Sequence, residues 1–289
     1  MEKDAGVITA RTGLICLLGY PVSHSLSPLM HNAAFQAQGL DMVYLAFSVP
    51  PADLETAVAG LKALGVRGAN VTVPHKEAVV SLLDDIAPLA ARIGAVNTIV
   101  NQAGHLVGHN TDAPGFLDAL QTVRPQGAEG ARFLIAGAGG AARAVVAAVC
   151  EAGAAAVLVY NRTAERAIAL CRAAANWGNA ECRAVGREDL AAALAEVDVV
   201  VNATSVGLQP GVKDPVVPVD NLDSRRHVVM DLVYGTKPTA LVAEARSKGV
   251  TAVDGLEMLI MQASRSYQLW TGRDAPVGVM RSSVAHAHS

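Results

Sequence analysis

Apolar and polar positions in the first half of the chain alternate between short strand-like runs and longer helical stretches. Four strands are predicted from runs rich in β-branched residues, near Leu14–Leu18, Val43–Val49, Ala69–Val73 and Val96–Val100. One intervening helix is predicted to begin at Ser27, with Ser27 as its N-cap and Pro28 at its first helical position. Another follows Pro51 and carries apolar residues at helical spacing: Leu54, Val58, Leu61 and Leu64.

A second series of the same kind starts near Arg132, after a loop at 124–127. Its strands are predicted at Phe133–Ala136, Val157–Tyr160, Val197–Asn202, Val228–Asp231 and Thr251–Val253. A final helix is predicted after Gly255, running to about Trp270. Strands that alternate with helices predict an α/β protein with mostly parallel sheets. The chain has 289 residues, enough for two domains.

Composition excludes several classes of function. The net charge is −3, no block of Lys and Arg stands out, and aromatic residues make up 4%, so a nucleic-acid partner is not expected. No apolar run reaches the roughly 18 residues that a membrane span needs, and the N-terminus lacks the basic start of a signal peptide. The four cysteines form no Cys-x-x-Cys pair and no zinc-like spacing, so we expect reduced thiols, no metal and a cytoplasmic location.

A glycine-rich segment follows the predicted strand Phe133–Ala136 and opens a helix. It comprises Gly137, Ala138, Gly139, Gly140, Ala141 and Ala142, a G-x-G-x-x-A pattern in strand–turn–helix context. The first glycine permits a tight turn, the second lets backbone approach a pyrophosphate, and the helix N-terminus offers free N–H groups to phosphate. We therefore predict dinucleotide binding, with a purely structural tight turn as the alternative.

The residues after the next strand indicate which dinucleotide binds. An acidic residue there would bind the ribose 2′-hydroxyl of NAD, but this chain has Asn161, Arg162 and Thr163, with Arg166 one turn later. Guanidinium groups pair well with phosphate oxygens, and positive charge is unfavourable at a helix N-terminus unless an anion binds. These residues favour the 2′-phosphate of NADP, against the alternative of two solvated arginines.

Small polar residues are dense at the predicted strand ends of the first half. They occur at 23–28, 70–76, 97–98 and 110–112. Ligands of open α/β sheets bind outside the carboxyl ends of strands, and these side chains could hydrogen-bond several hydroxyls and a carboxylate. Each has a plainer alternative: Ser27 and Thr111 could cap helices, Asn110 could form an Asx-turn, and Lys76 could be a surface lysine.

Together these motifs resemble the shikimate dehydrogenase family, in the family's order and from about residue 14 to 270. The segments that carry the resemblance are Ser-His-Ser-Leu-Ser-Pro (23–28), Gly-Ala-Asn-Val-Thr-Val-Pro-His-Lys (68–76), Gly-Ala-Val-Asn-Thr (94–98), Asn-Thr-Asp (110–112), Gly-Ala-Gly-Gly-Ala (137–141), Asn-Arg-Thr (161–163), Asn-Ala-Thr-Ser (202–205), Asp-Leu-Val-Tyr (231–234) and Asp-Gly-Leu-Glu-Met-Leu (254–259). Ala142 in the third glycine position is the one departure from a full fingerprint.

The resemblance implies an N-terminal αβ substrate-binding domain (1–112), a Rossmann-like NADP-binding domain (113–254), a C-terminal helical region returning to the first domain (255–289), and a cleft between the domains. It implies that Lys76 and Asp112 are the catalytic acid–base pair. Shikimate or 3-dehydroshikimate would be held by Ser25, Ser27, Thr72, Asn97, Tyr234 and Gln262, together with that pair. Leu232, Gly255 and Met258 would lie near the nicotinamide, and Gly137, Ala138, Gly139, Gly140, Ala141, Asn161, Arg162, Thr163 and Arg166 would bind the rest of NADP.

The activity implied is reversible, NADPH-dependent reduction of 3-dehydroshikimate to shikimate, on the chorismate route of aromatic amino acid biosynthesis. Two alternatives stay open: a quinate/shikimate dehydrogenase of the same fold with broader substrate or NAD use, and a non-catalytic dinucleotide-binding sensor. The joint presence of Lys76, Asp112 and the polar strand ends favours an enzyme over a sensor. The sequence leaves the oligomeric state open, a homodimer included.

Overall fold

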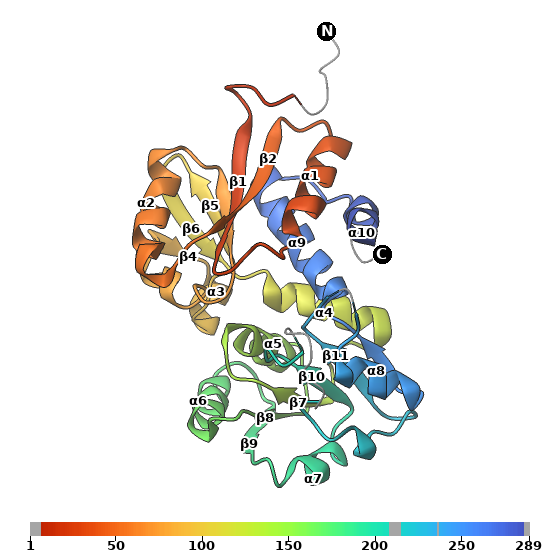
Figure 1. Ribbon diagram of the computed structural model, residues 1–289. Coiled ribbons are helices and arrows are strands. Elements are labelled where there is room, and N and C mark those ends of the chain that lie inside the picture. The colour runs from red at the N-terminus through yellow and green to blue at the C-terminus, as the bar shows by residue number, and fades with distance from the viewer. Residues whose placement is uncertain (1–6, 208–214, 236, 286–289) are drawn as a thin grey trace. The chain divides into compact units, whose positions relative to one another are not determined.

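The computed structural model describes residues 7–207, 215–235 and 237–285 of the chain (Figure 1). The chain divides into two compact units: unit 1 comprises Met1–Thr111 and Ile260–Ser289, and unit 2 comprises Asp112–Leu259. Each unit contains one six-stranded sheet with helices. The α/β class predicted from the alternating pattern is therefore confirmed.

Unit 1 is built on a mixed sheet with the strand order β2-β1-β3-β5-β6-β4. Its strands are β1 (Gly13–Gly19), β2 (Met42–Ser48), β3 (Gly68–Val71), β4 (Asp85–Ile86), β5 (Thr98–Gln102) and β6 (His105–His109). β1 pairs in parallel with β2 and β3, and β4 with β6, whereas β5 is antiparallel to both β3 and β6. A parallel sheet thus continues into a β5–β6 hairpin.

The helices of unit 1 are α1 (Ser27–Ala37), α2 (Leu54–Ala63), α3 (Pro88–Ile93), most of α9 (Leu256–Thr271) and α10 (Val277–Ala285), with 3-10 turns at Pro51–Asp53 and Ala78–Leu82. α1 begins at Ser27, but Leu26 occupies the N-cap position and no side chain caps the helix. The prediction that Ser27 is the N-cap is wrong: Ser25 Oγ instead accepts the Ser27 N–H at 3.3 Å.

Unit 2 is a parallel doubly wound domain with the strand order β12-β11-β10-β7-β8-β9. Its strands are β7 (Arg132–Ala136), β8 (Ala156–Tyr160), β9 (Glu181–Val185), β10 (Val199–Asn202), β11 (Val228–Asp231) and β12 (Thr251–Val253). Its helices are α4 (Asp112–Val123), α5 (Gly140–Glu151), α6 (Ala164–Ala174), α7 (Leu190–Leu194) and α8 (Ala240–Ser247), with a 3-10 turn at Val219–Asn221. Numbered within the unit, this is the dinucleotide-binding order, with the topological switch point between β7 and β10.

The structure corrects several boundaries. Thr72 and Val73 lie beyond the end of β3, because the following Pro74 has no N–H to continue a ladder. Leu64 falls just after α2 and is 79% exposed, so it does not join the buried stripe of that helix. β4, β6, β9 and α10 were not predicted, since β4 has only two residues, β6 and β9 carry polar side chains, and Gly278 lowers the helix propensity of α10.

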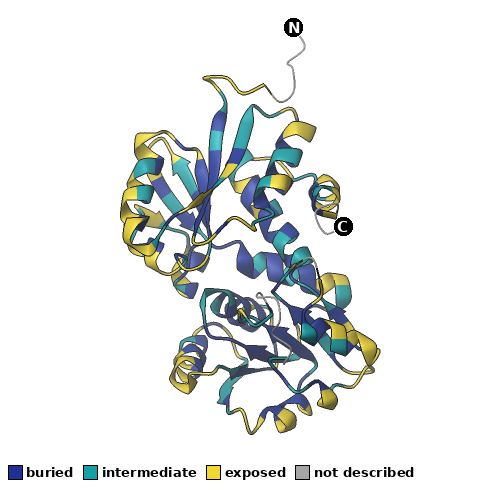
Figure 2. Cartoon of the chain, in the orientation of Figure 1, coloured by how far each residue is buried: buried dark blue, intermediate teal, exposed yellow. Residues whose placement is uncertain are grey.

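Each unit has a hydrophobic core of its own (Figure 2). In unit 1, Leu18, Val71 and Ile99 of the sheet pack with Val58 and Leu61 of α2. In unit 2, the β7, β8 and β10 side chains pack with α7 and α8 on one face of the sheet. The apolar side chains of the central strands are therefore buried.

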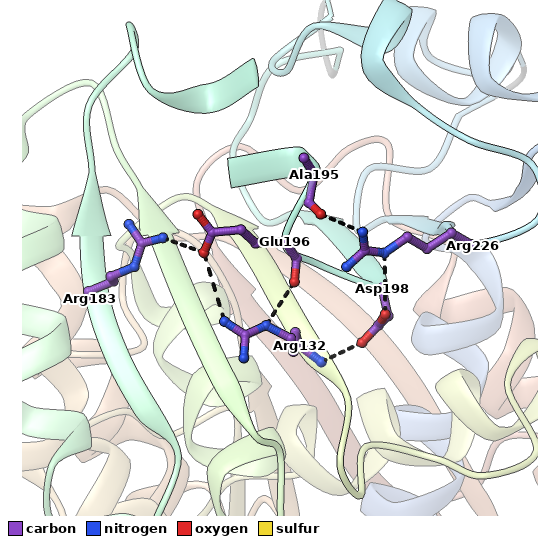
Figure 3. A network of polar contacts seen from close by, with 6 residues as sticks. All are labelled: Arg132, Arg183, Ala195, Glu196, Asp198 and Arg226. Carbon is purple, nitrogen blue, oxygen red and sulfur yellow. Dashed lines mark hydrogen bonds and ion pairs between the residues drawn. The ribbon is translucent and has the colours of Figure 1, made fainter. Parts of the chain in front are cut away.

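The amino ends of the unit 2 strands carry an exposed polar network (Figure 3). Glu196 accepts from Arg183 at 2.7 Å and lies 3.8 Å from Arg132, whose backbone N–H donates to Asp198 at 2.9 Å. Arg226 lies 3.6 Å from Asp198 and donates to the Ala195 carbonyl. These charged side chains are about one-third to nearly half exposed, so each pair stabilises the fold by at most about 1 kcal/mol.

An aromatic cluster in unit 1 encloses the side chain of His31. Its ring stacks on Tyr44 with centroids 4.6 Å apart, and Trp270 and Phe35 lie 5.3 and 6.1 Å away. The ring is fully buried, and neither nitrogen has a hydrogen-bond partner among the described residues. Burial lowers the pKa of His31 from 6.5 to about 3, so the folded protein holds this side chain neutral.

This neutral histidine should make the fold sensitive to acid. The unfolded chain binds a proton at His31 below pH 6.5, whereas the folded chain does not until about pH 3. Stability contributed by the neutral ring is therefore complete above pH 6.5 and is lost as pH falls, at about 1.4 kcal/mol per pH unit. Urea unfolding of His31→Phe should show a shallower loss of stability between pH 6.5 and 4.5 than the wild type. If the free energy of unfolding fell equally with pH in both proteins, the His31 ring would not be held neutral and unpartnered.

Candidate active site

One edge of the unit 1 sheet collects the predicted polar segments. β1 and β3 are parallel, so segments 20–27 and 72–76 leave from the same edge. Because β5 is antiparallel to β3 and β6 is antiparallel to β5, Asn97 before β5 and Thr111 after β6 lie at that edge too. Segments distant in sequence are thus brought together by strand direction alone.

The segment that carries Lys76 is held by backbone hydrogen bonds. Thr72 N donates to the Leu18 carbonyl at 2.9 Å, and the Lys76 carbonyl accepts from Val96 N at 2.8 Å. The buried ring of His75 places Nε2 2.7 Å from the Val49 carbonyl. Thr72 and Lys76 are half-buried.

Two serines precede and open α1. Ser25 is half-buried and Ser27 buried, and their segment turns through a Ser25 N–H bond to the Val22 carbonyl at 3.0 Å. Leu26 at the N-cap of α1 offers no side-chain acceptor, and Ser25 Oγ accepts the Ser27 N–H at 3.3 Å. Hydroxyl groups at an uncapped helix N-terminus can bind a carboxylate.

Asn97 and Gln262, predicted to bind ring hydroxyls, meet in unit 1. Asn97 Nδ2 donates to Gln262 Oε1 at 3.3 Å and to Thr111 Oγ1 at 2.9 Å. Asn97 Oδ1 accepts the Thr111 N–H at 2.7 Å, which fixes which end of the amide carries oxygen. All three residues are buried.

A buried layer of polar side chains supports this pair, and two of its members, Tyr44 and Ser266, lie outside the polar segments that the sequence singled out. Ser266 Oγ lies 2.8 Å from Thr98 Oγ1 and 3.0 Å from Thr111 Oγ1. Asn70 Nδ2 donates to Ser266 Oγ at 3.1 Å, and Tyr44 donates to Asn70 Oδ1 at 2.8 Å. One signal was present in the sequence: Ser266 follows Gln262 by one helical turn.

Unit 2 contains two of the residues predicted to contact the substrate, Asp112 and Tyr234. Asp112 is buried, directly follows Thr111 and is the first residue of α4. Tyr234 is half-buried after β11, and burial raises the pKa of its phenol. Asn110 donates from Nδ2 to the Ala95 carbonyl at 3.0 Å.

The glycine-rich turn of unit 2 lies between β7 and α5. Gly137 has φ +121°, its N–H donates to the Tyr160 carbonyl at 2.7 Å, and a Cβ there would lie 2.7 Å from the Ala203 carbonyl oxygen. Gly139 is the N-cap of α5, and a Cβ there would meet nothing within 4 Å. The turn therefore requires glycine at its first position and leaves open space before an uncapped helix N-terminus.

Exposed cationic side chains follow β8. Thr163 is the N-cap of α6, with Arg162 before it and Arg166 in the first turn, and Asn161 Nδ2 holds the turn by donating to the Thr163 carbonyl at 2.8 Å. Neither guanidinium makes a hydrogen bond or ion pair within residues 7–207, 215–235 and 237–285. Two cations near a helix N-terminus suit an anionic ligand.

The segments after β10 and β11 are held by a buried carboxylate. Asp231 accepts from Asn202 Nδ2 at 2.8 Å, Val233 N at 2.9 Å and Thr239 Oγ1 at 2.6 Å. Burial raises the pKa of Asp231 despite these donors. Leu232 N is fixed to the Asn202 carbonyl at 2.8 Å.

Three residues were predicted to lie near the nicotinamide: Leu232, Gly255 and Met258. Gly255 approaches the backbone of Leu232, and Met258 follows Gly255 by three residues. A Cβ on Gly255 would lie 2.2 Å from the Leu232 carbonyl oxygen, so only glycine allows this approach. Met258 is buried in the first turn of α9.

The residues that the structure describes contain neither a metal-binding cluster nor a membrane-spanning helix. No cluster of His, Cys, Asp or Glu among them could hold a metal ion. None of the described helices has the length and apolar character that crossing a membrane requires.

Comparison with known proteins identifies the family. Residues 17–99 match the shikimate dehydrogenase substrate binding domain, residues 119–258 the shikimate / quinate 5-dehydrogenase model, and residues 255–284 the shikimate 5'-dehydrogenase C-terminal domain. A shikimate dehydrogenase (NADP(+)) of Moorella thermoacetica is 50% identical over 275 residues, covering 94% of this chain and 92% of that protein.

Solved structures agree over almost the whole chain. A crystal structure of shikimate dehydrogenase in complex with NADP+ superposes with a TM-score of 0.92 at 38% identity, covering 99% of both chains. The Thermus thermophilus enzyme in complex with NADP(H) and shikimate gives 0.85 at 39% identity, covering 95% of this chain and 99% of the other. The chain, with its polar sheet edge in unit 1 and its glycine turn in unit 2, belongs to the shikimate dehydrogenase family.

Proposed function

We propose that this protein is an NADP-dependent shikimate dehydrogenase that reversibly reduces 3-dehydroshikimate to shikimate. The observation that carries the proposal is the convergence of Thr72, Lys76, Asn97 and Thr111 at one edge of the unit 1 sheet. A polyhydroxylated ring acid needs several hydrogen-bonding groups and an anion site in one place. Ser25 and Ser27 would hold the carboxylate with Tyr234, and Thr72, Asn97 and Gln262 would hold the ring hydroxyls.

The described residues of unit 2 fit NADP. Gly137 allows the tight turn, the space before Gly139 admits a pyrophosphate, and Ala138, Gly140 and Ala141 complete the phosphate loop. Asn161, Arg162, Thr163 and Arg166 would bind the 2′-phosphate, and Leu232, Gly255 and Met258 would lie beside the nicotinamide. When bound, the nicotinamide donates or accepts the hydride.

Lys76 and Asp112 would handle the proton of the reacting hydroxyl. A neutral lysine can take that proton during oxidation, and an ammonium group can donate it, or a hydrogen bond, to the oxygen during reduction. Asp112 would share the proton with Lys76, so that the two side chains act as one unit. Hydride transfer then needs no further acid or base from the chain.

We also propose a role for each of three regions of the chain. Residues 1–112 would bind the ring acid, 113–254 the cofactor, and 255–289 would complete the first region through Gln262. Reduced cysteines, all four of which are free, support a cytoplasmic location. A homodimer is proposed as an assembly to be tested by light scattering.

Initial rates for shikimate and quinate, each with NADP and NAD, test this function. We expect shikimate with NADP to give the highest kcat/KM, because both arginines after β8 suit a 2′-phosphate. A higher kcat/KM for quinate would favour the quinate/shikimate alternative. The match of residues 119–258 to a shikimate / quinate 5-dehydrogenase model is compatible with either substrate. No turnover with any combination would favour the non-catalytic sensor.

Replacing Arg162 and Arg166 together with alanine should weaken NADP selectively. Loss of charge-assisted hydrogen bonds should raise the KM for NADP at least about tenfold and leave that for NAD within about twofold. Arg172→Ala is the matched control, since Arg172 is an exposed arginine in the last turn of the same helix. Equal loss of NADP and NAD binding would show that the two arginines have a structural role instead.

Lys76→Ala should lower kcat by at least about a hundredfold while NADP still binds. Asp112→Asn should also be severe, because it keeps the shape and loses the charge. If the pair acts as a unit, the double variant should be little worse than the worse single one. Lys62→Ala, which removes an exposed lysine paired with Asp84, should leave kcat unchanged. Near-normal turnover in Lys76→Ala would remove this lysine from the mechanism, and multiplicative losses would show independent roles.

A further inference from the structure

The hydroxyl of Ser266 is the centre of the polar layer beneath Asn97 and Gln262. It is completely buried and contacts four groups from four parts of the chain. These are Asn70 Nδ2 at 3.1 Å, Thr98 Oγ1 at 2.8 Å, Thr111 Oγ1 at 3.0 Å and the Gln262 carbonyl at 3.1 Å. A serine needed only to end or pack a helix would not require so many partners.

The directions of these hydrogen bonds can be worked out from the backbone N–H of Thr111, because a backbone N–H can donate but not accept. The Thr111 backbone N–H donates to Asn97 Oδ1, so the other end of that amide, Nδ2, faces Thr111 Oγ1 and Gln262 Oε1. Having accepted from Asn97, the Thr111 hydroxyl can donate to Ser266 Oγ, which in turn donates to the Gln262 carbonyl. One chain of donors thus runs from the Asn97 amide through two hydroxyls to the backbone of Gln262.

Thr98 fixes the other side of the same amide. Its hydroxyl lies 3.2 Å from Asn97 Oδ1, and Asn70 Nδ2 donates to it at 3.2 Å. Asn70 is itself oriented by the Tyr44 hydroxyl at 2.8 Å. The amide of Asn97 is therefore held at both ends by groups that are themselves held.

We propose that Ser266 and Thr98 are positioning residues that fix the side chains of Asn97 and Gln262 for binding of a polyhydroxylated ring. The proposal rests on the proposed function and goes beyond it by assigning the support of the ring site to a buried hydroxyl layer. Neither hydroxyl touches the substrate in this assignment. Both act through the orientation of the two amides.

Removal of the Ser266 hydroxyl has a specific consequence. The Thr111 hydroxyl loses an acceptor, and the next oxygens in reach are Thr98 Oγ1 and Asn97 Oδ1, both at 3.2 Å, and Gln262 Oε1 at 3.5 Å. It would then compete for the amides assigned to the ring hydroxyls. Substrate binding should suffer more than the chemical step.

Steady-state kinetics of Ser266→Ala test the proposal. We expect the KM for shikimate to rise about three- to tenfold, with kcat and the KM for NADP within about twofold of wild type. Thr271→Ala is the matched control, because Thr271 Oγ1 donates to the Tyr267 carbonyl at 2.8 Å in the same helix but has no link to Asn97. This control should leave all three constants unchanged.

Background variants separate positioning from general destabilisation. In Asn97→Ala or Gln262→Ala enzyme, adding Ser266→Ala should raise the KM for shikimate by less than about twofold, because the group it acts through is gone. An unchanged KM in Ser266→Ala, or full additivity in both backgrounds, would overturn the proposal. An inactive wild type would instead refute the proposed function, so the two failures are distinguishable.

A second pair of variants covers the case in which Ser266→Ala does not fold. Thr98→Val removes the hydroxyl and keeps the shape, whereas Thr98→Ser keeps the hydroxyl and loses a methyl group. We expect Thr98→Val to raise the KM for shikimate about three- to tenfold and Thr98→Ser to restore it. Equal values for the two variants would show that packing, not hydrogen bonding, is what matters at this position.

Discussion

The antiparallel pairing of β5 with β3 is the constraint on which the ring site of unit 1 depends. The register that places Asn70 opposite Thr98 puts the start of β5 beside the end of β3, so Asn97 and the Lys76 segment share an edge. The return of the chain along β6 brings Thr111 to the same edge. A β5 strand parallel to β3 would have placed Asn97 at the opposite edge.

That edge is polar and buried, which requires each group to find a partner. Buried amides and hydroxyls without hydrogen bonds would cost more than their contacts gain. In unit 1 these groups form hydrogen bonds with one another. The bonds connect side chains of β3, β5, the segment before α4, and α9. A network satisfied in this way has few alternative arrangements, and it therefore gives the site a defined geometry before any ligand binds.

The proposed cofactor site of unit 2 is formed largely by backbone groups, whereas the proposed substrate site of unit 1 is formed by side chains. The loop proposed to bind phosphate depends on a turn with positive φ at Gly137 and on an uncapped helix N-terminus, and two arginines add charge at the end of β8. The Asp231 carboxylate, rather than a ligand contact, holds the segments after β10 and β11. Phosphate is recognised well by N–H groups and guanidinium, and a ring of hydroxyls by amides and hydroxyls, so the two solutions suit their ligands.

The sequence by itself determined the α/β class, most strands, the glycine turn and the cationic end of β8, because these follow from local periodicity and from motifs within a few residues of one another. Gln262 was named only through the resemblance to a family, whereas Asn97 also belongs to a polar segment at a predicted strand end. Their meeting, and the roles of Tyr44, Asn70, Thr98 and Ser266 beneath them, were decided by tertiary structure. These six residues lie on strands and helices up to 222 positions apart, as Tyr44 and Ser266 show. A hydrogen bond between such residues leaves no periodic signal in the chain, since it depends on strand direction and helix packing rather than on neighbouring residues.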